Sequence, residues 1–71
     1  MATIEAAVTA QWGPRFIYRQ AAIDSLRWSI ETGRPADEAI RGLANATSPG
    51  PNAPSQKEIT RARAAYMAAL P

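Results

Sequence analysis

One stretch decides the fold of this chain: residues 14–33, which read PRFIYRQAAIDSLRWSIETG. Pro14 suits the first turn of a helix, because its missing N–H costs no hydrogen bond there. Gly33 suits the position just after a helix end, where a left-handed backbone is common. The stretch therefore predicts a helix over about residues 14–32.

The apolar side chains of this predicted helix surround most of its circumference. At helical spacing they form two stripes, and the first consists of Phe16, Ile23, Leu26 and Ile30. The second stripe lies to the side and consists of Ile17, Ala21 and Trp28. The polar strip that remains is narrow: Gln20, Asp24, Arg27 and Glu31. We therefore expect this helix to be the central one, contacted on several sides.

Shorter helices are expected on both sides of the central helix. Thr3 is a typical N-cap residue for a first helix, and Gly13 followed by Pro14 is a stop signal. Pro35 begins a further helix, which we expect to end near Ala44. Residues 45–54 contain three prolines, a glycine and two asparagines, which predicts a Pro-rich loop.

The last helix has the clearest start signal in the chain. Ser55 and Glu58 have the spacing of a capping box, in which each residue satisfies a backbone N–H of the other. The helix is expected to end near Leu70, and no alternating pattern typical of a strand occurs anywhere. The predicted fold class is all-α, with three to four short helices packed around a central helix (about 14–32). Residues 1–71 are expected to form a single small helical domain.

The size of the chain limits its core. Hydrophobic residues make up 46% of the 71 residues, but 16 of them are Ala and only 17 are larger. A chain of this length buries only about 60% of the surface that its unfolded form exposes. We therefore expect a thin core, which a partner protein or another copy of the chain helps to complete.

The residue types that most catalytic sites need are missing. The chain has no Cys and no His, which excludes disulfides, thiolate nucleophiles, imidazole bases and the usual zinc sites. Asp24 and Glu31 share a helix strip with Arg27, which neutralises them, and no glycine-rich segment could cradle a phosphate. We therefore expect no enzymatic activity, no cofactor, no metal and no small-molecule substrate.

The sequence also carries a weak indication of location. No apolar run of about 18 residues occurs, and the N-terminal residues lack the basic and apolar regions of a secretory signal. A cytoplasmic location is expected, or a virion if the chain is phage-encoded, with no membrane partner. Abundant Ala, with seven Arg among eight basic residues, is typical of a high-GC bacterium or its phage.

The second stripe of the central helix suggests a contact with another protein or with a second copy of the chain. Trp, Tyr and Arg are enriched at the residues that dominate binding energy. Arg19 is expected inside an apolar arc, where it must reach water, pair with an acid such as Glu5, or meet a partner. The predicted partner-binding residues are Ile17, Arg19, Ala21 and Trp28.

The alternative is a small nucleic-acid-binding regulator that uses the basic C-terminal helix. Residues 41–71 have a charge balance of +3, whereas residues 1–40 have −1. The polar side chains that would contact nucleic acid are Gln56, Lys57, Thr60, Arg61 and Arg63. The Pro-rich loop is longer than the tight turn of a helix-turn-helix motif, which weighs against this alternative.

Overall fold

The computed structural model describes residues 2–71, and it confirms the all-α fold class. Its four helices are α1 (Ile4–Trp12), α2 (Arg19–Glu31), α3 (Ala36–Thr47) and α4 (Gln56–Ala69). Thr3 is the N-cap of α1, as predicted, and its side chain accepts a hydrogen bond from the backbone N–H of Ala6 at 3.0 Å. Within residues 2–71, no helix is long and apolar enough to cross a membrane.

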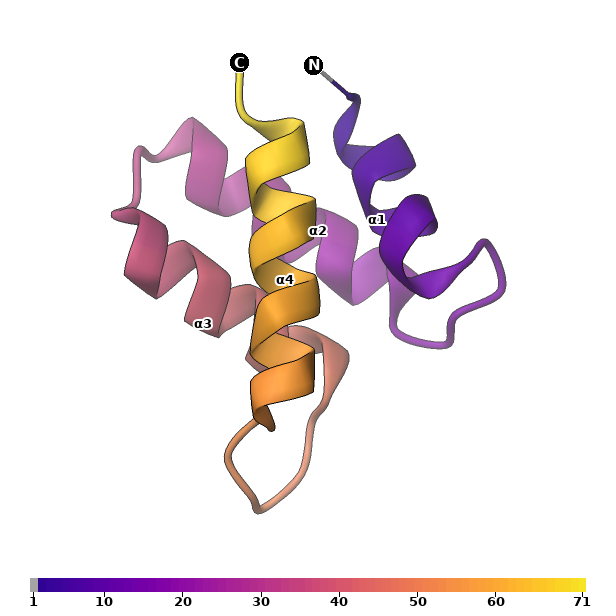
Figure 1. The fold of residues 1–71 in the computed structure, drawn as a ribbon. Coiled ribbons are helices and arrows are strands. Elements are labelled where there is room, and N and C mark those ends of the chain that lie inside the picture. The colour runs from indigo at the N-terminus through magenta and orange to yellow at the C-terminus, as the bar shows by residue number, and fades with distance from the viewer. Residues whose placement is uncertain (1) are drawn as a thin grey trace.

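The four helices share the core instead of surrounding a single one. α2 packs against α1 and α3, and α4 packs against the same two helices. Figure 1 shows α1 and α3 on opposite sides of α4, with α2 behind them. α2 and α4 thus occupy equivalent positions between α1 and α3, so the central role expected for α2 is divided between the two. The reason is that α4 presents small Ala side chains, which allow close helix approach.

α2 is shorter than predicted, because the segment before it folds back onto α1. The helix begins at Arg19 and not at Pro14. Phe16 stacks on Trp12 with a ring-centroid distance of 5.9 Å, and Tyr18 meets Phe16 edge-on at 5.7 Å. This aromatic packing holds residues 14–18 as a loop, so Phe16 is not part of the apolar stripe of the helix. Such tertiary contacts override the local signal that Pro14 provides.

The end of α2 matches its prediction. Gly33 has a positive φ of 68°, and its N–H donates to the Ile30 carbonyl at 3.3 Å. The N–H of Arg34 donates to the Ser29 carbonyl at 2.9 Å. These two hydrogen bonds form a Schellman motif, which requires a left-handed residue and so favours glycine.

α3 runs three residues further than predicted, and the loop after it is correspondingly shorter. Residues 45–47 are helical, and residues 48–55 form the loop that precedes α4. Thr47 is buried, and its hydroxyl donates to the carbonyls of Leu43 and Ala44 at 3.0 and 3.1 Å. The hydroxyl of Thr47 is therefore satisfied inside the helix, which makes its burial in the last turn acceptable.

Alanine provides much of the core, which is why a count of large side chains underestimates it. Seven of the 13 buried hydrophobic residues are alanines: Ala7, Ala22, Ala39, Ala44, Ala62, Ala65 and Ala69. The Cα radius of gyration is 10.7 Å, against about 11 Å for a compact domain of this length. The helices therefore pack closely on each other, and the large side chains left exposed among residues 2–71 are Ile17, Tyr18, Trp28 and Met67.

The predicted capping box is present at the start of α4. Ser55 Oγ accepts from the backbone N–H of Glu58 at 3.3 Å, and a Glu58 carboxylate oxygen accepts from the backbone N–H of Ser55 at 3.2 Å. The Ser55 hydroxyl also donates to the Glu58 carboxylate at 2.9 Å. The nearby Ser48 hydroxyl, together with the Ser55 backbone N–H and hydroxyl, holds the pKa of Glu58 below its ordinary value of 4.5. The Ser48 hydroxyl also donates to the Ala44 carbonyl at 2.6 Å. The Ser48 hydroxyl has only one proton, which it cannot donate fully to both the Ala44 carbonyl and the Glu58 carboxylate. The hydrogen bonds from Ser55 are therefore the main cause of the lowered pKa of Glu58.

The capping box makes the stability of the fold depend on pH. Because the pKa of Glu58 is lower in the folded chain, its contribution is present above pH 4.5 and is lost as the pH falls further. Glu58→Gln keeps a capping side chain but cannot titrate. We expect its free energy of unfolding, measured by urea denaturation, to fall less than that of the wild type between neutral and acidic pH.

Glu31→Gln is the matched control for this experiment. Glu31 is exposed, and its carboxylate makes no hydrogen bond or ion pair among residues 2–71. This variant should keep the acid sensitivity of the wild type. If Glu58→Gln also kept the acid sensitivity of the wild type, the Glu58 carboxylate would not be the source of that sensitivity.

Candidate protein-interaction surface

The loop between α1 and α2 holds an isoleucine out in solvent. The side chain of Ile17 is 81% exposed, and the loop projects at the edge of the molecule beside α1 (Figure 1). The aromatic packing of Trp12, Phe16 and Tyr18 fixes the residues on either side of Ile17. The backbone N–H of Arg19 also donates to the Phe16 carbonyl at 3.0 Å. Ile17 is therefore presented by a braced loop and not by a loose one.

Arg19 takes part in this bracing and does not project outward. Its Nε donates to Thr9 Oγ1 at 3.2 Å, and the contact is partly buried. The suggested pairing of Arg19 with Glu5 is wrong, because Glu5 accepts from Arg27 at 3.0 Å instead. The error follows from the start of α2: residues 14–18 are not helical, so Arg19 reaches back across the loop to α1. Arg19 therefore positions the loop that carries Ile17.

Ala21 and Trp28 lie together on the outer side of α2. They are seven residues apart, which places them on one helix face two turns from each other. The side chain of Trp28 is 52% exposed although it is the largest on the helix. The guanidinium of Arg34 lies 4.3 Å from the centroid of the Trp28 ring, which is a cation–π contact.

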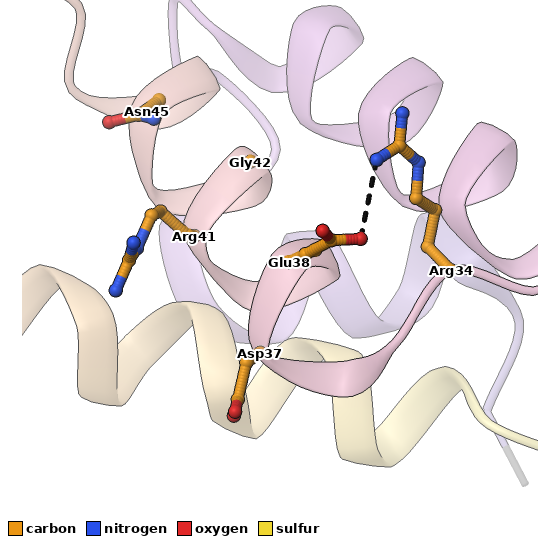
Figure 2. Close-up of a pocket in the computed structure, with 6 residues that line it drawn as sticks. All are labelled: Arg34, Asp37, Glu38, Arg41, Gly42 and Asn45. Carbon is orange, nitrogen blue, oxygen red and sulfur yellow. Dashed lines mark hydrogen bonds and ion pairs between the residues drawn. The ribbon is translucent and has the colours of Figure 1, made fainter.

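The support of Trp28 extends to α3. Arg34 Nη1 donates to a Glu38 carboxylate oxygen at 3.4 Å (Figure 2), so Glu38, Arg34 and Trp28 form a chain of contacts. The sequence reasoning missed Arg34 and Glu38 as supports of Trp28. Their spacing of four residues was a usable signal, although Arg34 precedes the helix. We use the name α2 outer surface for three exposed residues, Ala21 and Trp28 on α2 and Ile17 in the loop that precedes it.

The five residues predicted to contact nucleic acid lie on the side of α4 opposite its buried residues, spread over about 160° of the helix circumference. Gln56, Lys57 and Thr60 are exposed on the first turns of α4. Arg61 and Arg63 are two positions apart, so they lie about 160° from each other, at the two edges of this arc. Arg63 lies on the α3 side, where it lines a hollow with Arg41, whereas Arg61 is half-buried.

The tight turn of this fold precedes α3 and not α4. Four residues, 32–35, connect α2 to α3, whereas residues 48–55 connect α3 to α4. A helix-turn-helix protein contacts bases through the N-terminal part of its second helix. In α3 that part carries Asp37 and Glu38, whose negative charges oppose the phosphates. The helix that follows the tight turn, α3, therefore begins with acidic side chains and not with basic ones.

These features define a small all-α protein of four helices with exposed apolar side chains on α2 and on the loop that precedes it. Among residues 2–71, no group of three or more acidic side chains is placed to hold a metal ion. Comparison of the chain with protein-family models, curated proteins and solved structures gave no match. What the molecule does must therefore be inferred from its own residues.

Proposed function

We propose that this chain is a non-enzymatic protein–protein interaction module. It acts as an accessory subunit, an adaptor or a phage-type assembly or host-interaction factor, in the cytoplasm of a bacterium or in a virion. The partner is another protein or a second copy of the chain, and it binds the α2 outer surface. The observation that carries the proposal is the exposure of Ile17 and Trp28 outside a core that is already closed.

The bracing of both anchors supports this proposal. Binding costs about 0.5–1.5 kcal/mol for each side chain that must be ordered. Ile17 lies on a loop fixed by aromatic packing, and Trp28 is held by Arg34, so part of this cost is met before the partner arrives. Large apolar side chains that are exposed and already ordered are typical of interface anchors. Arg19 contributes indirectly, through the loop.

Co-purification from the native source followed by mass spectrometry tests the proposal. We expect a double variant, Ile17→Ser with Trp28→Ala, to lose the partner protein. Truncation of one central anchor weakens binding by roughly thirtyfold, or about 2 kcal/mol. If the partner is a second copy, the same double variant should instead lower the sedimentation coefficient of the purified protein.

Met67→Ser is the matched control. Met67 is 60% exposed on α4, so this variant removes a comparable apolar side chain from a different helix. It should keep the partner, and circular dichroism should show that all variants fold. If the double variant kept its partner and its sedimentation coefficient, the α2 outer surface would not be the interface.

The alternative of a nucleic-acid-binding regulator retains one supporting observation. Gln56, Lys57 and Thr60 are exposed at the start of α4, where their polar side chains are accessible to a nucleic acid. A gel-shift series separates the two functions, because affinity for nucleic acid falls steeply with added salt. Equal mobility shifts for the wild type, Lys57→Ala and Arg61→Ala would exclude the alternative.

A further inference from the structure

A groove runs between α3 and α4, on a part of the molecule that the proposed function does not use. It consists of two hollows that share Arg41 and Ile59. The first has a volume of about 140 Å³ and is also lined by Asp37, Ile40 and Arg63. The second has a volume of about 390 Å³ and continues beside the loop, where its lining includes Asn45, Ala53 and Pro54. We call the two together the α3–α4 groove.

The floor of the groove is apolar and firmly held. Ile40 is only 6% exposed and belongs to the buried core, and Ile59 packs against that core. Ala53 and Pro54 add a small apolar wall, and Pro54 has no N–H that would need a partner. The groove therefore offers a place for an aliphatic side chain on an ordered base.

The rim of the groove carries two arginines that are free to bind an anion. Neither Arg41 nor Arg63 makes an ion pair with any residue in 2–71, where the two pairs present are Arg27–Glu5 and Arg34–Glu38. Figure 2 shows Asp37 and Arg41 extending from α3 toward α4. Asp37 leaves the groove with a net charge of +1, from two arginines and one aspartate.

We propose that the α3–α4 groove binds a peptide segment of another protein in which an Asp or Glu side chain adjoins an aliphatic one. One carboxylate neutralises the charge of the groove, and arginine pairs with carboxylates through two parallel hydrogen bonds. The aliphatic side chain covers Ile40 and Ile59, while Asp37 accepts a backbone N–H of the peptide. A nucleic acid fits less well, because its successive phosphates would meet Asp37.

Nitrogen-15-labelled full-length protein, titrated with short peptides and followed by NMR, tests this proposal. The probes are two acetylated and amidated hexapeptides, Gly-Gly-Leu-Glu-Gly-Gly and its Leu-Gln analogue. We expect the Leu-Glu peptide to shift the backbone amides of Ile40, Arg41, Ala53 and Ile59. The Leu-Gln peptide should bind roughly tenfold more weakly, because it loses one charge-assisted pair.

Two variants test whether Arg63 is the arginine that pairs with the carboxylate. Arg63→Gln should reduce the affinity for the Leu-Glu peptide to that for the Leu-Gln peptide. Arg15→Gln removes the same charge from the exposed loop between α1 and α2, so it should leave the affinity unchanged. The site lies apart from the α2 outer surface, so the double variant at Ile17 and Trp28 should bind the Leu-Glu peptide normally.

Three outcomes would overturn the proposal. The first is an absence of shifts in the groove. The second is an equal affinity for the two peptides that Arg63→Gln does not change. The third is tighter binding of an oligo-dT strand to the same residues, lost in Arg63→Gln, which would make the groove a nucleic-acid site instead.

Discussion

Leu26→Ala is expected to lower the free energy of unfolding by about 2–5 kcal/mol, because it leaves a cavity that the surrounding helices cannot fill. Leu26 is on α2 and its side chain is fully buried. A domain of this length has a total stability of only about 4–10 kcal/mol. The variant should therefore be largely unfolded at a urea concentration at which the wild type remains folded, as measured by circular dichroism.

Met67→Ala is the control for the Leu26 experiment. It removes a side chain of similar size that is 60% exposed on α4. Its effect should stay within about 0.5 kcal/mol, as for most surface substitutions. Equal losses of stability in the two variants would mean that Leu26 is not in the core described here.

Ala65→Leu is expected to destabilise the chain by about 1–3 kcal/mol although Leu is a good helix former and more hydrophobic. Ala65 lies on α4 with its side chain fully buried, next to Tyr66. The added carbon atoms would force α4 away from α1 and α3, the two helices that it contacts. Thermal unfolding should therefore show a lower midpoint, by roughly 4–8 °C for each kcal/mol in a domain of this size.

Ala64→Leu provides a close comparison. Ala64 is the neighbouring residue on the same helix, and its side chain is exposed. The chemical change and the helix propensity are the same, so any difference between the two variants reflects the packing of Ala65. A thermal midpoint that fell equally in both, or in neither, would contradict the alanine-based core.

The local signals at helix ends could be predicted well from the sequence. The N-cap Thr3, the positive-φ Gly33 and the capping box of Ser55 and Glu58 all lie where the sequence placed them. Each of these features is a hydrogen bond or a backbone preference within a few residues. Local chemistry decides them, and tertiary packing has little influence on them.

The contacts between segments could not be predicted in the same way. The sequence left three alternatives open for Arg19, one of them a pairing with an acid such as Glu5, whereas Glu5 pairs with Arg27, and Arg19 donates to Thr9. The partners of Arg19 and Glu5 depend on where α2 begins. The start of α2 depends in turn on Phe16 stacking against Trp12, a contact between the loop and α1 that helical periodicity does not report.

The candidate surface illustrates the same division. The sequence singled out Ile17, Ala21 and Trp28 as a side stripe, but not the braced loop that exposes Ile17 or the guanidinium that covers part of Trp28. It also did not indicate that Arg41 and Arg63, which are 22 positions apart, line one hollow. Such a pairing exists only after α3 and α4 have packed.

The amino-acid sequence by itself determined the all-α class, the number of helices to within one, and most of their ends, because turns and caps are short-range chemistry. Only the tertiary structure decided which of the 16 alanines form the core. Alanine is small enough to be tolerated on the surface as well as in the core, so the close approach of the helices selects the buried ones. The same packing filled the core with small side chains and left Ile17 and Trp28 in solvent.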